Sequence, residues 1–296
     1  MRTAAVDTPR SALSPPILAC LFATWIIWGS TYLGIKFALA SFPPFFQGGS
    51  RFLIAGSLLL LWVAWRRKQM PTLVQWRNGL VVGAIMLGSN MGGVVYAEQT
   101  VASGLVVSFI AVVPALVTIF SLPFGVRPTR LEIAGIALGI VGVLLLVQGA
   151  AFTASPAGVI AMIIAAIGFA VGAVLSQHVL RLAPGFGGYA TQMLGAGVVL
   201  MALSFLAGER FSWPPQAGAA VAWVYLVIFG SLIAFTAYMF LLGNTRPALA
   251  TSSSFVNPVV GVLLGVSLGG ETVTSHEWLA IGIITFGVTV LILGRR

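Results

Sequence analysis

Long apolar stretches alternate with short polar breaks along almost the whole chain. A helix needs about 20 mostly apolar residues to cross a bilayer, and ten stretches meet this length. They cover residues 17–39, 45–65, 76–97, 101–122, 131–150, 157–181, 188–207, 219–242, 247–269 and 277–294. They lack period-2 alternation and are too long for tilted β-strands, which excludes a barrel. The pattern predicts an all-α integral membrane protein with ten transmembrane helices.

Basic residues gather at every second break between these stretches. Cytoplasmic loops carry the Lys and Arg excess of membrane proteins. The basic breaks therefore predict that both termini are cytoplasmic, with the intervening breaks outside. The residues concerned are Arg2, Arg10, Arg66, Arg67, Lys68, Arg77, Arg127, Arg130, Arg181, Arg246, Arg295 and Arg296.

Composition supports a membrane protein and limits where function can lie. Of 296 residues, 59% are hydrophobic and only 7% are charged, whereas soluble domains carry about 25% charged residues. The net charge of +9 is spread over short loops, so a nucleic-acid partner is not expected. Residues 1–16 are polar and are expected to form a disordered cytoplasmic tail. No soluble domain fits between the helices, so any function must lie inside the bundle.

The two halves of the chain, residues 17–150 and 157–294, resemble each other. Pro114 and Pro258 follow runs of small residues in the fourth and ninth stretches, and Glu132 and Glu277 open the fifth and tenth. The match continues with Gly142 and Gly287, and weaker matches pair Trp76 with Trp223 and Gly83 with Gly230. Each half has an odd number of crossings, so the second must enter from the opposite side. Two inverted five-helix repeats are a transporter architecture with its site near mid-membrane.

The paired prolines are candidate gating elements. Proline removes a backbone hydrogen bond and kinks a helix, and membranes tolerate this where neighbours satisfy the freed carbonyl. Equivalent kinks at Pro114 and Pro258 would give each half a bend at the same place. Simple packing curvature is the alternative.

Four segments resemble the drug/metabolite transporter superfamily, EamA type, and most of all its YddG-type amino-acid exporters. They are WGSTYLGIKFAL (28–39), RFLIAG (51–56), YAEQTVASGLVVSFIAVVPALVTIFS (96–121) and ATSSSFVNPVVGVLLGVSLGGETVTSHEWLAIG (250–282). The resemblance implies a bacterial inner-membrane protein shaped as a basket of ten helices. Helices one, three, four, six, eight and nine would line a central cavity, with two and seven at the sides and five and ten behind.

Polar and ionisable groups inside apolar stretches are costly and are therefore candidates for lining an aqueous path. Lys36 shares a face of the first helix with Tyr32 and could hold a substrate carboxylate, or it could snorkel to the external surface. Arg51 is expected to be structural, paired with a carboxylate or helix-end carbonyls. His178 could relay protons, although an interfacial histidine is the favoured interpretation.

The remaining substrate-binding candidates are amides, hydroxyls and aromatic rings in the third, first, eighth and ninth stretches. Trp28 and Phe235 would form apolar walls, and Tyr96 and Gln99 lie at the expected external mouth. The full set is Trp28, Tyr32, Lys36, Asn90, Tyr96, Gln99, Ser231, Phe235, Tyr238, Ser254 and Asn257.

No Asp or Glu lies deep in any stretch, which disfavours strong ion coupling and favours a facilitator. We therefore expect a monomeric exporter of small metabolites, foremost neutral or aromatic amino acids, that works by alternating access without a cofactor or metal. Export of lipophilic cationic drugs is an alternative. An intramembrane enzyme is a further one, although the paired Asp clusters, HExxH and GxSxG motifs of such enzymes are missing.

Overall fold

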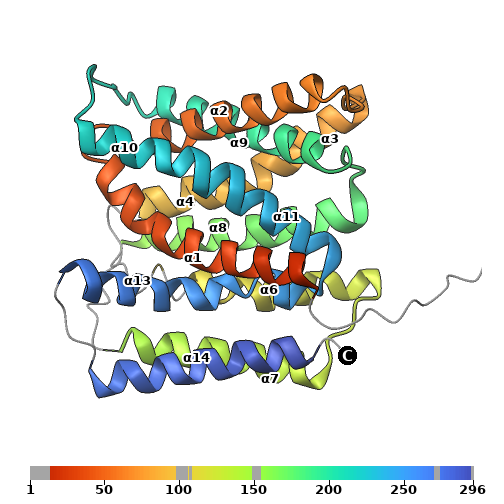
Figure 1. Cartoon of the computed structure of the whole chain (residues 1–296), viewed down its shortest axis with the longest axis vertical. Coiled ribbons are helices and arrows are strands. Elements are labelled where there is room, and N and C mark those ends of the chain that lie inside the picture. The colour runs from red at the N-terminus through yellow and green to blue at the C-terminus, as the bar shows by residue number, and fades with distance from the viewer. Residues whose placement is uncertain (1–13, 98–105, 107–108, 149–154, 270–273, 295–296) are drawn as a thin grey trace, which may run out of the picture.

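The computed structural model describes residues 14–97, 106, 109–148, 155–269 and 274–294, which form helices and no β-strand (Figure 1). In chain order the elements are α1 (Pro15–Ala38), α2 (Pro44–Trp65), α3 (Leu73–Gly83), η1 (Ala84–Gly88), α4 (Ser89–Ala97), α6 (Val113–Ser121), η2 (Leu122–Phe124), α7 (Arg130–Leu146), α8 (Pro156–Val174), η3 (Leu175–Val179), α9 (Phe186–Leu206), α10 (Ala217–Tyr225), η4 (Leu226–Ile233), α11 (Ala234–Asn244), α12 (Pro247–Ala250), α13 (Ser253–Gly269) and α14 (Ser275–Leu293).

These elements join into ten helical stretches that match the ten predicted from the sequence. In the described residues, 8 helices are long and apolar enough to cross a membrane, and a shorter apolar helix covers Phe109–Phe124. The one remaining stretch, fifth in chain order, is α7, with 17 residues. The predicted class, an all-α multi-pass membrane protein, is confirmed.

Most contacts between a helix of the first half and a helix of the second half have a counterpart between the equivalent helices of the opposite halves. Helix α1 packs against α13 and α11, and its counterpart α8 packs against α6 and α4. The pairs α2 with α9 and α7 with α14 each join equivalent helices of the two halves, and α7 with α14 forms a separate layer at one edge of the molecule (Figure 1). In the same view α1 begins and α14 ends on one side. Two repeats related by a two-fold axis would produce this pattern of contacts.

Local details repeat between the halves as well. A π-helical segment interrupts the third stretch at η1 and the eighth at η4. Just after the end of η1 and of η4, the hydroxyls of Ser89 and Thr236 each donate to the carbonyl four residues earlier. Helices α7 and α14 begin with the same capping box, formed by Thr129 with Glu132 and by Thr274 with Glu277. Such boxes satisfy backbone N–H groups that a helix start leaves free.

Glycines allow the helices to approach closely, as their spacing in the sequence suggests. A Cβ atom at Gly83 would overlap the backbone carbonyl of Gln192 in α9. At Gly287 in α14, a Cβ would lie 3.0 Å from the backbone nitrogen of Gly139 in α7. Close backbone packing replaces the hydrophobic driving force that lipid does not supply.

Candidate functional site

A central cavity of about 110 Å³ lies between helices of both halves. In the first half, its walls come from α1, η1, α4 and the helix Phe109–Phe124, which includes α6. In the second half, they come from α8, η4, α11 and the start of α13. These are the stretches that the family resemblance implied. Helix α2 also contributes, through Arg51 and Phe52, although the resemblance placed it at the side. Trp28 and Phe169 lie near the middle of their helices, so the cavity is at mid-bundle.

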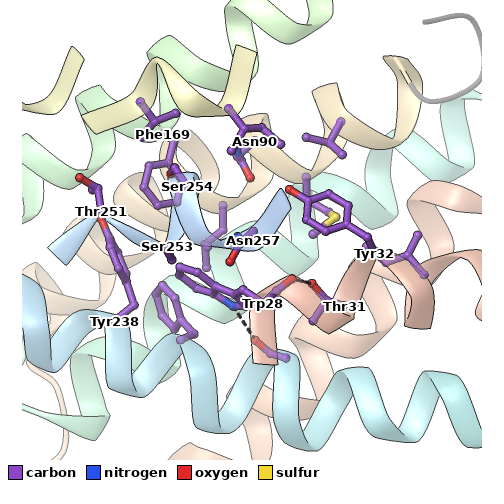
Figure 2. A pocket seen from close by; sticks show the side chains of 18 of the residues that line it. Trp28, Thr31, Tyr32, Asn90, Phe169, Tyr238, Thr251, Ser253, Ser254 and Asn257 are labelled. Atoms are coloured by element: carbon purple, nitrogen blue, oxygen red, sulfur yellow. Dashed lines mark hydrogen bonds between the residues drawn. The ribbon is translucent and has the colours of Figure 1, made fainter. Parts of the chain in front are cut away.

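Aromatic rings form one wall of the cavity. Tyr238 is fully buried, and its ring centroid lies 5.3 Å from that of Trp28 and 5.4 Å from that of Phe169. The indole nitrogen of Trp28 donates to the carbonyl of Gly230 in the π segment η4, at 3.2 Å. Because Gly230 also lines the cavity, the π segment fixes the orientation of this wall. Figure 2 shows Trp28 and Tyr238 reaching the cavity from different helices.

Hydroxyl and amide groups at and just before the start of α13 form another part of the wall, close to Tyr238 and Trp28 (Figure 2). The helix is interrupted between α12 and α13, at residues 251–252. The cavity-lining residues of this region are Thr251, Ser253, Ser254 and Asn257. Asn257 is 6% exposed, and its Oδ1 atom accepts no hydrogen bond from the described residues. The hydroxyl of Tyr238 also has no partner among them. Polar groups of this kind fix the orientation of a ligand in a mostly apolar pocket.

Arg51 brings a positive charge to the cavity. Its side chain is 4% exposed, and Nε and Nη1 make no hydrogen bond within the described part of the chain. The guanidinium carbon lies 4.8 Å from the ring centroid of Phe52. From the sequence, Arg51 is expected to be structural and paired with a carboxylate or helix-end carbonyls. Among the described residues, no carboxylate forms an ion pair with it.

The structure brings together most of the substrate-binding candidates. Seven line the cavity: Trp28, Tyr32, Asn90, Phe235, Tyr238, Ser254 and Asn257. Lys36 is exposed at the last turn of α1, which agrees with the snorkelling alternative. Tyr96 is 42% exposed and Ser231 is fully buried, and neither lines the cavity. Gln99 lies outside the described residues.

The gating and proton-relay candidates lie away from the cavity lining. Pro114 sits in the first turn of α6, just after a turn at Val112, whereas Pro258 lies inside α13. The two prolines therefore do not make equivalent kinks. Proline is tolerated without loss of a hydrogen bond in a first turn, whereas Pro258 lies in the interior of α13. His178 is exposed at the end of the sixth stretch, and its ring stacks on Phe124 at 4.9 Å.

Several lining residues were not singled out from the sequence as substrate-binding: Thr31, Arg51, Phe169, Thr251 and Ser253. The hydroxyl run 251–254 was a usable signal, because consecutive polar residues inside an apolar stretch are costly unless they face a cavity. Phe169 gave no signal, since it is one more apolar residue in an apolar helix. Within the described residues, no three His, Cys, Asp or Glu side chains gather as metal ligands would.

Comparison with known proteins relates both halves of the chain to membrane transporters. The model of the EamA-like transporter family matches residues 15–148 and again 156–293. An Escherichia coli K12 protein described as the uncharacterized inner membrane transporter YedA is 43% identical over 281 residues, covering 95% of this chain and 92% of that protein.

More distant matches agree on the architecture. A Salmonella typhimurium protein described as a probable amino-acid metabolite efflux pump is 23% identical over 286 residues, covering 92% of this chain and 93% of its own length. One crystal structure aligns with a TM-score of 0.79 at 22% identity, covering 95% of this chain and 97% of the other. At that identity the alignment shows the shared fold.

Proposed function

Because the chain belongs to the EamA-like transporter family, we propose that it exports small metabolites, foremost neutral and aromatic amino acids. Export would proceed across a bacterial inner membrane, with both termini cytoplasmic. One observation carries the proposal: the central cavity is built at mid-bundle by helices of both halves. A site shared by two inverted repeats can open to either side when one repeat rocks against the other.

The chemistry of the walls favours an amino acid over a lipophilic cation. Trp28, Phe169 and Tyr238 offer an apolar surface, and Asn90 and Asn257 offer amides that can both donate and accept. No carboxylate lies among the lining residues of the described chain, although a desolvated cation requires one. The relative described as an amino-acid metabolite efflux pump points to the same cargo.

The start of α13 adds a further feature suited to an amino acid. Helix N-termini carry a partial positive charge, and at the start of α13 the N–H groups of Ser254 and Phe255 donate to the carbonyls of Thr251 and Ser252. Ser253 and Ser254 place this end of α13 on the cavity. A carboxylate in the cavity would therefore be attracted from this side too, whereas a cation would be repelled.

Counterflow in proteoliposomes tests the proposal. Vesicles loaded with unlabelled phenylalanine, methionine or threonine should accumulate the same labelled amino acid without an imposed proton gradient. Vesicles with Ser254→Trp, which fills the cavity, provide the matched control and should show the background rate. Accumulation of a labelled lipophilic cation in place of every amino acid tested would contradict the proposed cargo.

A further inference from the structure

Arg51 presents a chemical problem that the rest of the structure does not solve. A buried cation is strongly destabilising unless an anion or several hydrogen-bond acceptors compensate it. Arg51 is 4% exposed, and two of its three nitrogens have no partner among the described residues. The ring of Phe52, 4.8 Å from the guanidinium carbon, supplies a cation–π contact. That contact is weaker than a full ion pair.

The described carboxylates are all engaged elsewhere. Glu132 accepts from Arg246 at 3.0 Å. Glu209 accepts from the backbone N–H groups of Phe45 and Phe46, at 3.0 and 2.8 Å, where α2 begins. Glu277 accepts from Thr274 in the capping box of α14. None of these three carboxylates neutralises Arg51.

The position of Arg51 gives its unpaired nitrogens a route to a ligand. The residue lines the same cavity as Asn90, Tyr238 and Asn257. The hydroxyl of Tyr238 and Oδ1 of Asn257 are likewise buried and unpaired in the described chain. Three residues with buried polar atoms that have no partner in the described chain therefore line one cavity, from α2, α11 and α13.

The chemistry of the Arg51 guanidinium indicates which group of a ligand would bind it. Arginine is always charged and presents planar N–H donors that match both oxygens of a carboxylate. The ammonium of an amino acid would require an acceptor, and the unpaired Oδ1 of Asn257 is a neutral one. A neutral acceptor contributes less than a carboxylate would, because charge-assisted hydrogen bonds are about twice as strong. The carboxylate end of the cargo should therefore dominate recognition.

We propose that Arg51 binds the carboxylate of the transported molecule, so that the cargo is a small carboxylic acid, with or without an amino group. The inference rests on the proposed transport through this cavity, and it narrows the substrate class. Molecules with the same apolar part but without a carboxylate are excluded. Lys36, the candidate carboxylate ligand named from the sequence, has no part in this recognition, because it lies on the exposed surface.

Ligand binding to the purified protein separates this inference from transport. The probes are phenylalanine, 3-phenylpropionate, phenylethylamine and phenylalaninamide, which share a ring and differ in the carboxylate and amine. Binding is measured by thermal stabilisation in detergent and by fluorescence of the tryptophans, one of which, Trp28, lines the cavity. The two carboxylates should bind, and the amine and amide should bind at least about tenfold more weakly. Equal binding of all four probes would overturn the proposal without reference to transport.

Variants identify the residue responsible. Arg51→Gln should remove the preference for carboxylates, and Arg51→Lys should retain part of it, because the charge remains while the planar donor pair is lost. Lys36→Gln should keep the full preference. Should Arg51→Gln fail to fold, the comparison of Arg51→Lys with Lys36→Gln and the wild-type probe series still decide the question. Carboxylate preference lost in Lys36→Gln and intact in Arg51→Lys would refute the assignment.

A structural pairing of Arg51 with Glu98, which lies outside the described residues, gives a different signature. In that case Arg51→Gln and Glu98→Gln would lower the unfolding temperature by similar amounts, and the double variant would lose little more. Folded single variants would then keep their preference for carboxylates. This combination would overturn the proposal, whereas loss of the preference in Arg51→Gln alone supports it.

Discussion

Tyr238→Ala is expected to abolish transport and to lower the free energy of unfolding by about 3–5 kcal/mol. The Tyr238 side chain is fully buried and packs against Trp28, Phe169 and Phe235 from two other helices and its own. Its removal would leave a void that these rings cannot fill without moving the cavity wall. Thermal unfolding in detergent and counterflow in proteoliposomes measure the two effects separately.

Tyr238→Phe is the matched control for that substitution. It keeps the ring and its packing, and the hydroxyl it removes has no partner among the described residues. Stability should therefore stay within about 1 kcal/mol of the wild type or improve, because an unsatisfied buried group is removed. The transport rate should fall nonetheless, because Tyr238 lines the cavity and we expect its unpaired hydroxyl to bind the cargo. Wild-type transport in Tyr238→Phe would show that this hydroxyl does not contact the cargo.

Arg246→Gln is expected to cost about 2 kcal/mol of stability, because it leaves the buried Glu132 carboxylate without its positive partner. Nη1 of Arg246 lies 3.0 Å from Oε2 of Glu132, whose side chain is only 5% exposed. Nη2 donates to the carbonyl of Arg127 at 3.3 Å. The side chain of Arg246 is 34% exposed, so solvent screening reduces the loss below that of a fully buried pair. This contact joins α7 of one half to the start of α12 in the other.

A double-mutant cycle identifies the pair as the cause. Glu132→Gln alone should cost less than Arg246→Gln, because the arginine left behind can reach water. The double variant should recover part of the loss of Arg246→Gln. Glu277→Gln is the matched control, since Glu277 forms the same capping box in the other half without a described ion pair. An Arg246→Gln loss no greater than that of Glu277→Gln would show that the ion pair contributes little.

The ten helices could be predicted because hydropathy is the dominant constraint in a bilayer. Each predicted stretch corresponds to a helical stretch of the structure, and α1 (Pro15–Ala38) differs from the predicted 17–39 by two residues at its start. Interruptions within the stretches could not be predicted this way. The π segments η1 and η4 and the break between α12 and α13 change the path of the backbone without changing its hydropathy.

The candidate site was harder to predict because it depends on which side of a helix faces inward. Ser231 and Tyr238 are seven residues apart and would share a face in a regular α-helix. The π segment η4 contains extra residues per turn, so Gly230 rather than Ser231 reaches the cavity. For Lys36 and Arg51, both cations in apolar stretches, only the packing of α2 against its neighbours distinguishes the buried group from the exposed one.

The most direct test of transport through this cavity is the accessibility of one of its residues from each side of the membrane. Ser254→Cys in a Cys20→Ala background places a single thiol on the cavity wall. A membrane-impermeant methanethiosulfonate reagent is then applied to right-side-out and to inside-out vesicles. Alternating access predicts modification from both sides, slowed from both by phenylalanine. Modification from one side only, unaffected by any carboxylate tested, would contradict it.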